Sequence, residues 1–399
     1  MPDQCVVTFA QVLSRHGSRD PTAGKSAKYR ETIDYIHQHA RSYHKALSFL
    51  KKYRYSLGAD QLTAFGEQQL VNSGAKYYRR YRALAKGVVP FIRASGQDRV
   101  VVSAQKWAEG FHTARLADDD VSEHDDYPYK IVVVAEGDAF NNTLSHSTCS
   151  QYDTSIANSE QGAWASIFVE PITKRLSRLL RTELSREQTI YLMDLCPFET
   201  VANIRGLPSR FCRLFTMDEW KQYDYYQSIG KYYGFSWGNP LGATQGVGFA
   251  NELVARLTNS PVIDHTNTNS TLDGSEETFP VGLKTALYAD FSHDNDMMSI
   301  FAALGMYNAT LPLSNSTIAT AEEMHGFSAS WTVPFAARAY FEKIKCTDQD
   351  EEYVRVIVND RVLPLDTCGG DALGRCTLSR FVDSLSFARG GGNWDKCFA

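Results

Sequence analysis

The chain has 399 residues, which is enough for one large domain or two modest ones. Apolar residues make up 43% of the chain and charged residues 22%, a balance that excludes a disordered or fibrous protein. Its net charge of −5 argues against a nucleic-acid partner, because such proteins present a basic face. No apolar run approaches the length of a membrane span, so we expect no membrane partner.

The first predicted element is a strand that ends in a charged turn. Residues 6–13 form an apolar run typical of a buried strand, and residues 15–21 follow it with the sequence Arg-His-Gly-Ser-Arg-Asp-Pro. The guanidiniums of Arg15 and Arg19 suit phosphate oxygens. Two such charges lower the pKa of the His16 imidazole, and a neutral imidazole is a nucleophile. The turn therefore predicts attack on phosphorus.

The rest of the chain predicts strands and helices that alternate at both ends and a helical stretch between them. In chain order, we expect helices at 28–53 and 63–85, a strand at 88–96, a second apolar piece at 99–102 leading into a helix at 103–116, a strand at 131–134, a largely helical stretch at 148–233, a helix at 246–258, a loop at 261–277, a strand at 286–291, a helix at 296–304 and a hairpin at 354–365. This alternation predicts an α/β fold with a helical insertion.

The predicted elements divide the chain into two domains. We expect residues 1–30, 60–145 and 245–399 to form an α/β catalytic domain. Residues 31–59 and 146–244 would then form a mainly α-helical domain that covers the substrate cleft.

Charged residues follow three of the predicted strands at the points where the strands end. They are Arg15, His16 and Arg19 after the first strand, Arg93 after Ile92, and His293 and Asp294 after Phe291. Ligands of open α/β sheets bind beyond the carboxyl ends of the strands, so these side chains could meet. Phosphoryl transfer needs this set: cations for the oxygens, a nucleophile, and an acid for the leaving oxygen.

The motif Arg15-His16-Gly17-x-Arg19-x-Pro21, together with the later pair His293-Asp294, resembles the histidine acid phosphatase family. Further segments resemble its fungal phytase branch, and the similarity covers nearly the whole chain. These segments are residues 55–60, 90–95, 239–251, 288–295 and 385–389. The resemblance implies a histidine phosphatase fold similar to phosphoglycerate mutase, with a large α/β domain, a central mixed sheet flanked by helices, and a smaller all-α domain.

The resemblance also implies roles for individual residues. His16 would be the nucleophile that forms a phosphohistidine, and Asp294 would protonate the leaving alcohol. Arg15, Arg19, Arg93 and His293 would hold the phosphate, and Lys25 and Asn295 match further substrate-binding positions. Lys25 is equally compatible with a solvated charged face. No metal and no cofactor are implied.

Cysteines and glycosylation sequons indicate the compartment. The eight cysteines form an even number, and Asn-x-Ser/Thr sequons occur at Asn141, Asn269, Asn308 and Asn315. Together they favour a secreted, extracellular glycoprotein. Proximity suggests the pairs Cys196–Cys212 and Cys368–Cys376. The resemblance implies these two pairs and adds Cys5–Cys346 and Cys149–Cys397.

We therefore expect a monomeric phosphomonoesterase acting on phytate, with small phosphate esters as its only partners. A broad acid phosphatase with little phytate preference is the main alternative, because Asp20 stands beside Arg19 where the family has an uncharged residue. An intracellular mutase or regulatory phosphatase conflicts with the cysteines and the sequons. A catalytically inactive phosphate-binding protein conflicts with the intact His16 and Asp294.

Overall fold

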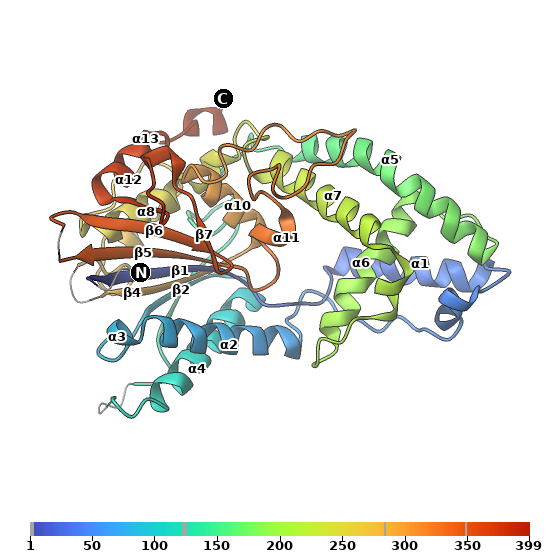
Figure 1. Cartoon of the computed structure of the whole chain (residues 1–399), viewed down its shortest axis with the longest axis horizontal. Coiled ribbons are helices and arrows are strands. Elements are labelled where there is room, and N and C mark those ends of the chain that lie inside the picture. Colours follow the sequence, from blue (N-terminus) through green and yellow to red (C-terminus); the bar gives the residue numbers. More distant parts are fainter. Residues whose placement is uncertain (1–3, 122–125, 283–284, 348) are drawn as a thin grey trace.

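The protein is described here from a computed structural model that covers residues 4–121, 126–282, 285–347 and 349–399. An eight-stranded mixed sheet lies at its centre, in the order β3-β2-β4-β1-β5-β6-β7 with β8 beside β6 (Figure 1). The strands are β1 (Cys5–Arg15), β2 (Phe91–Ser95), β3 (Ile131–Val134), β4 (Leu287–Ser292), β5 (Arg338–Cys346), β6 (Glu352–Val358), β7 (Arg361–Leu363) and β8 (Arg375–Thr377). This architecture confirms the predicted α/β class with a mixed sheet.

The pairing of the central strands brings their carboxyl ends to one edge of the sheet. β1 runs parallel to β4, with Arg15 opposite Ser292, and β4 runs parallel to β2, with Asp290 opposite Arg93. All six residues of β4 are buried, as expected for a strand covered on both faces. The residues that follow β1 and β4 therefore start from neighbouring positions.

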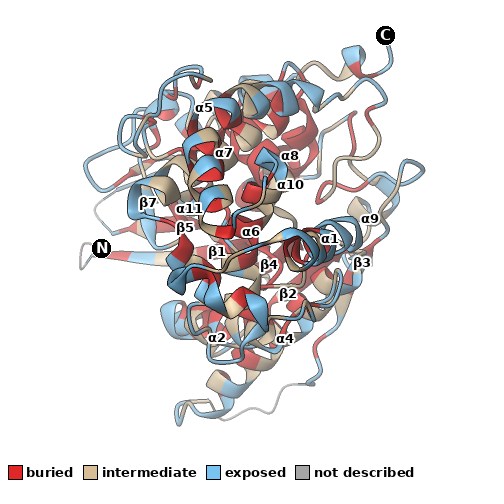
Figure 2. Ribbon diagram, turned by 90° about the vertical axis from the view of Figure 1, so that its right-hand side faces the viewer, coloured by how far each residue is buried: buried red, intermediate tan, exposed pale blue. Residues whose placement is uncertain are grey.

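Helices cover both faces of the sheet (Figures 1 and 2). One face carries α2 (Ala64–Arg80), α3 (Arg82–Ala85) and α4 (Asp98–Leu116). The other face carries α8 (Val247–Thr258), α10 (Asp294–Ala303), α12 (Leu378–Ser384) and α13 (Ser386–Arg389). The sheet is buried between these two layers, which explains the near-continuous apolar runs of its central strands.

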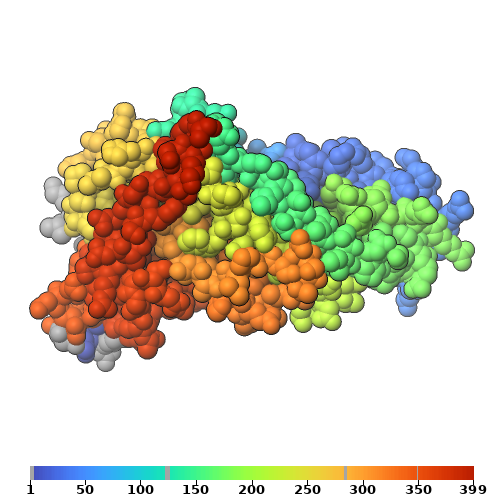
Figure 3. All heavy atoms as spheres, turned by 90° about the horizontal axis from the view of Figure 1, so that it is seen from above, coloured from blue at the N-terminus to red at the C-terminus, as the bar shows by residue number. Residues whose placement is uncertain are grey.

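A second group of helices extends from one end of the sheet (Figures 1 and 3). It consists of α1 (Ala23–His39), α5 (Ser155–Leu180), α6 (Arg186–Ala202) and α7 (Met217–Phe235). One continuous core joins the two parts, since Leu13 of β1, Trp164 of α5 and Phe249 of α8 belong to the same buried cluster. The grouping supports the two-domain division, which we retain as a proposal.

The shorter elements lie in the connections. They are the short helices α9 (Ser270–Asp273) and α11 (Ala329–Thr332) and the 3₁₀ segments Lys45–Lys51, Arg210–Leu214, Ala243–Gly246, Asp366–Cys368 and Trp394–Cys397. The described part of the chain contains no helix with the length and hydropathy that a bilayer crossing requires.

Two local expectations have different outcomes. The predicted hairpin is confirmed: β6 and β7 are joined by Asn359 and Asp360, whose φ angles of 45° and 69° suit a tight hairpin turn. The prediction of a separate apolar piece at 99–102 before the helix is wrong, because helix α4 begins at Asp98 and contains these residues. A run of three valines fits a buried helix face as well as a strand.

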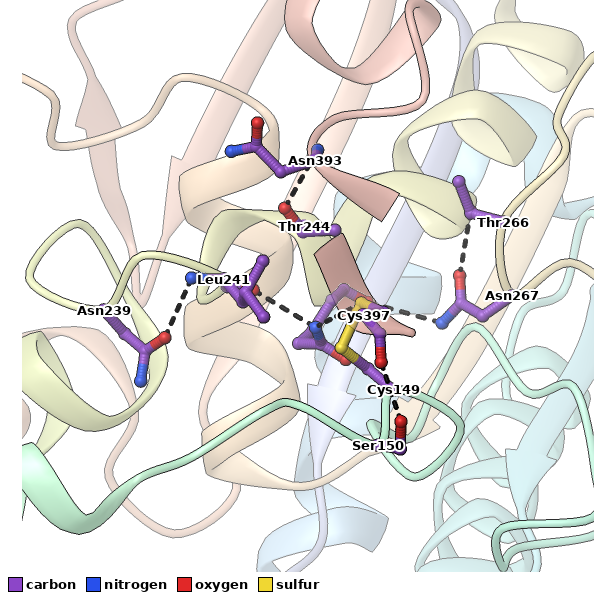
Figure 4. The surroundings of a disulfide bond; sticks show 10 residues. Cys149, Ser150, Asn239, Leu241, Thr244, Thr266, Asn267, Asn393 and Cys397 are labelled. Atoms are coloured by element: carbon purple, nitrogen blue, oxygen red, sulfur yellow. Dashed lines mark hydrogen bonds between the residues drawn. A yellow bond between two sulfur atoms is a disulfide. The ribbon is translucent and has the colours of Figure 1, made fainter. Parts of the chain in front are cut away.

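All four expected disulfides are present. They are Cys5–Cys346, Cys149–Cys397, Cys196–Cys212 and Cys368–Cys376. Figure 4 shows the second of them, which joins the loop after β3 to the C-terminal segment. Beside it the Ser150 hydroxyl donates to the Cys397 carbonyl at 2.8 Å.

Candidate active site

The turn after β1 holds His16 at the base of the site. His16 is 1% exposed, and its backbone continues the sheet by donating to the Ser292 carbonyl. Its Nδ1 lies 2.8 Å from the Gly17 carbonyl oxygen. Because a carbonyl only accepts, Nδ1 carries the proton, and in a neutral ring this leaves the Nε2 lone pair free. Burial and the Arg15 charge hold the pKa of His16 well below its usual value.

A close contact with helix α2 fixes the shape of this turn. A Cβ on Gly17 would lie 2.4 Å from the Gly66 carbonyl oxygen, and a Cβ on Gly66 would lie 1.9 Å from the Ser18 carbonyl oxygen. The Thr63 side chain caps α2, while its backbone N–H donates to Ser18 at 3.0 Å. Only glycine permits this approach of two backbones, so the motif glycine has a packing reason.

Three arginines converge beside His16. Arg15 is the last residue of β1, Arg19 lies in the turn that follows, and Arg99 lies in the first turn of α4. Burial and the charges of Arg15 and Arg99 lower the pKa of Arg19 to about 10, and the Arg99 charge also lowers the pKa of Arg15. Within the described residues, the Nε atoms of all three have no hydrogen-bond partner. Two carboxylates face the three cations, Asp294 at 3.3 Å from Arg15 and Asp60 at 3.9 Å from Arg99, so the cluster is only partly compensated.

Arg93 lies elsewhere, which corrects the expectation that it holds phosphate. Its side chain is 3% exposed and is fully engaged: Nε donates to Asp290 at 2.8 Å, and the two terminal nitrogens donate to Glu252 at 2.9 and 2.5 Å. Phosphate would have to displace two carboxylates. Sequence reasoning missed Arg99, because residues 99–102 were interpreted as an apolar piece that precedes the helix. A cation in the first turn of a helix that follows a strand end was the available signal.

His293 follows β4 and faces His16, with 5.5 Å between the ring centroids. Its Nε2 lies 3.0 Å from Glu136, which also accepts from the Ser95 hydroxyl at 2.6 Å. Burial alone would raise the pKa of Glu136, but the hydrogen bond from His293 lowers it to about 2. Glu136 therefore orients His293. Its position two residues after the strand Ile131–Val134 was a signal that sequence reasoning did not use.

Asp294 begins helix α10 and contacts two cations. Its Oδ2 lies 3.3 Å from Arg15 and 2.5 Å from the Nζ of Lys231, which also donates to Asn295 at 2.5 Å. Burial would raise the pKa of Asp294, but Arg15 and Lys231 hold it well below its usual value. Lys231 lies among the aromatic residues of α7, as Lys221 does, and nothing in the sequence distinguished it.

A cleft of about 780 Å³ opens above these groups, between the strand ends and the helices α1, α6 and α7. Arg15, Arg19, Lys231 and Asp294 line its inner end. The outer part is largely aromatic and carries few charges; its lining includes Lys25, Tyr29, Asp194, Phe198, Trp220, Tyr223, Asp224, Tyr226 and Phe335.

The two remaining residues of interest lie at the margin of the site. The Lys25 ammonium lies 5.0 Å from the ring centroid of Tyr191 and lines the cleft. The Asp20 side chain points toward Gly58, and its backbone carbonyl accepts from Arg19 at 2.7 Å. Burial raises the pKa of Asp20. The carboxylate therefore lies against Gly58, where the Arg19 charge opposes the rise in its pKa.

The chain is similar in sequence to known enzymes over its whole length. The chain is 54% identical over 403 residues to phytase A of Aspergillus oryzae and 52% identical to phytase A of Aspergillus fumigatus. Each match covers 100% of this chain and 86% of the relative.

Solved structures share the fold. The phytase from D. castellii superimposes with a TM-score of 0.80 at 21% identity and covers 100% of this chain and 83% of its own. A Bifidobacterium longum multiple inositol polyphosphate phosphatase, in complex with inositol hexasulfate, gives a TM-score of 0.67 at 14% identity, with 97% and 93% covered. The sequence model of the histidine phosphatase superfamily (branch 2) matches residues 6–359. The chain therefore belongs to branch 2 of the histidine phosphatase superfamily.

Proposed function

We propose that the protein is a phytase, a phosphomonoesterase that hydrolyses inositol hexakisphosphate through a phosphohistidine. The observation that carries the proposal is the buried His16, whose Nδ1 is bonded to a carbonyl and whose pKa is lowered by burial and by the neighbouring Arg15 guanidinium. Relatives named phytase A at about half identity over the whole chain support the substrate.

In the first step, Nε2 of His16 attacks phosphorus and the bond from phosphorus to the alcohol oxygen breaks. Arg15, Arg19 and Arg99 hold the non-bridging oxygens, with His293 as a further donor. The proton of the Asp294 carboxyl passes to the leaving oxygen. In the second step, water attacks phosphorus and the bond from phosphorus to Nε2 of His16 breaks. Asp294 takes a proton from that water, phosphate leaves, and His16 is regenerated.

Asp294 needs a proton at the start of this cycle. In the free site Arg15 and Lys231 keep it ionised. A bound phosphate engages Arg15 and adds negative charge beside the carboxyl, and both effects raise the pKa of Asp294. His16 stays neutral at acidic pH because its own pKa is low. The two requirements are met together on the acid side of neutral, where we expect the highest activity.

The test is phosphate release from inositol hexakisphosphate and from p-nitrophenyl phosphate between pH 2.5 and 8, with a chelator present. We expect acidic turnover of the hexakisphosphate, and we expect His16→Ala to abolish release from both substrates. The exposed His39, changed to alanine, is the matched control and retains activity. Wild-type rates in the His16 variant would contradict the mechanism.

The lining of the cleft favours a second candidate, a broad acid phosphatase. Beyond the arginine cluster and Lys231, the cleft contributes one lysine, Lys25, against the carboxylates Asp194 and Asp224, and much of its wall is aromatic. An aromatic wall binds aryl esters, whereas a highly charged polyanion needs more cations. A higher kcat/KM for the aryl ester than for the hexakisphosphate would favour this candidate.

We further propose that the protein is a secreted, monomeric glycoprotein that uses Lys25 and Asn295 as outer substrate contacts. The four disulfides support an oxidising compartment. Of the four sequon asparagines, Asn141 and Asn308 are exposed. Glycan mapping after expression in a secreting fungus tests both sites.

A further inference from the structure

A second ion pair lies directly behind the acid Asp294. Nδ1 of His146 contacts Oδ1 of Asp296, two residues after Asp294 in the first turn of α10. Asp296 is 4% exposed, and the His146 ring packs edge-on against Tyr152 and Phe235 with centroid distances of 5.5 and 5.4 Å. A buried carboxylate in such an apolar setting requires a cation, and among the described residues His146 is the one paired with it.

This pair is linked to the reacting groups through helix α7. Phe235, which packs against His146, also lies 5.7 Å from the ammonium of Lys231. Lys231 in turn donates to Asp294 and Asn295. The first turn of α10 is thus held from two sides, by Lys231 at its first two residues and by His146 at its third.

The electrostatic balance around His146 favours its charged form. Burial would lower the pKa of His146, but the Asp296 and Asp294 carboxylates raise it above its usual value against the opposing charge of Lys231. The groups facing His146 are thus Asp294 and Asp296 from α10, Lys231 and Phe235 from α7, and Tyr152 from the segment before α5. Arg15, from the end of β1, faces Asp294 from the opposite side.

We propose that the His146–Asp296 pair positions the acid Asp294 and that the positive charge of His146 sets the upper pH limit of the reaction. His146 and Asp296 are positioning residues, because they act through α10 and do not line the cleft. A cation near Asp294 favours the carboxylate form, so the acid loses its proton at a lower pH than it would without His146. The inference rests on the proposed role of Asp294.

The two partners have opposite direct effects on Asp294, which gives the proposal a signature. Removing the His146 charge lets Asp294 keep its proton to higher pH. Removing the Asp296 charge has the reverse direct effect, but it also deprives His146 of the partner that keeps it charged. The two consequences of the Asp296 change therefore oppose each other, and its net effect is the smaller one.

The experiment compares kcat against pH for wild type, His146→Asn and Asp296→Asn. Asparagine at 146 can donate to Asp296 without carrying charge. With an alkyl phosphate, whose poor leaving group needs the proton, we look at the alkaline limb, the part of the profile where kcat falls as pH rises. We expect His146→Asn to move this limb to higher pH by roughly half to one pH unit. Asp296→Asn should move it less. With p-nitrophenyl phosphate, whose leaving group needs little help, both shifts should shrink.

The exposed His265, changed to asparagine, is the matched control and leaves the limb in place. Thermal melts establish that each variant is folded. A folded His146→Asn enzyme with the wild-type limb, or with reduced kcat and an unmoved limb, overturns the proposal and leaves the pair a structural role. Failure of the proposed function is a different outcome, because it appears in the His16→Ala variant and in the absence of phosphate release by the wild type.

Discussion

Arg93 and Arg99 lie six positions apart and have opposite environments. Arg93 is enclosed by Glu252 and Asp290, whereas Arg99 lies beside the other two arginines and has one distant carboxylate, Asp60, at 3.9 Å. The same residue type therefore serves the fold at one position and, in our proposal, the substrate at the other.

We predict that the two alanine variants separate these roles. Arg99→Ala should fold normally and lose about 10²- to 10³-fold in kcat/KM, because one donor to the transferred phosphate is missing. Arg93→Ala should lower the free energy of unfolding by about 3–5 kcal/mol, because it leaves buried carboxylates without a partner. Urea titration and steady-state kinetics measure the two effects, with the exposed Arg41→Ala as control. A folded Arg99→Ala enzyme with full activity would refute the assignment.

Asp294 gives a second prediction at this scale. Asp294→Asn cannot deliver a proton, so the rate of the first step should depend more steeply on the leaving group than in the wild type. Alkyl phosphates should lose the most, and aryl phosphates with acidic leaving groups the least. A series of phosphate esters with graded leaving-group pKa values measures the slope. An unchanged slope would assign the acid to another residue.

The sequence could predict those site residues whose position follows from a strand end. All five lie at the end of β1 or β4 or within four residues after it, and the structure brings them to one edge: Arg15, His16, Arg19, His293 and Asp294. Residues that reach the site from a helix carry no such signal. Lys231 lies near the C-terminal end of α7, and its contact with Asp294 depends on how α7 packs, which is a tertiary property.

Between elements, a buried ionic cluster joins β2, β4, α8 and α9. It contains the cations Arg93 and Arg256 and the carboxyls Glu252, Asp290 and Asp273. The two positive charges balance two of the three carboxylates. The cluster as a whole is therefore neutral only if the third carboxyl keeps its proton. Burial and the neighbouring Glu252 raise the pKa of Asp273 to about 7.

This cluster predicts how stability depends on pH. A carboxyl whose pKa is raised in the folded state binds its proton more tightly there than in the unfolded chain. Its contribution is complete below about pH 4, the usual value for aspartate, and is lost as pH rises to about 7. Asp273→Asn should therefore flatten the dependence of Tm on pH and raise Tm above pH 7. An unaltered pH dependence in this variant would show that the extra proton lies elsewhere.

The order of strands and helices along the chain was also predictable, but the pairing of the strands in the sheet was not. Alternating apolar runs and glycine- or proline-marked turns indicate an α/β sheet. The partners of β1 are less accessible to sequence reasoning, because β5 pairs with it across more than 320 residues and no local pattern encodes that pairing. The start of α4 was predicted five residues late, at Ser103, because the apolar run at 99–102 has no helix-specific spacing.

For the whole molecule, disulfides that close long loops should matter most. Cys149 and Cys397 are 248 residues apart, whereas Cys368 and Cys376 are 8 apart. We predict that the double serine variant of the first pair loses about 2–4 kcal/mol of unfolding free energy, and that the variant of the second pair loses less, because a longer loop constrains the unfolded chain more. Denaturation under non-reducing conditions measures both. Equal losses would show that local strain or packing dominates.

The position of β1 has a consequence for how the enzyme is made. Its eleven residues are synthesised well before both neighbours in the sheet, β4 and β5, which come from residues 287–346. At about 5–20 residues per second, the strand waits roughly 15–60 s for its first partner to be synthesised. The nucleophile, which follows β1, is thus synthesised long before the strands that complete its site. A nascent chain has no working site for most of its synthesis, and its longest apolar strand depends on chaperones or early collapse for protection until then.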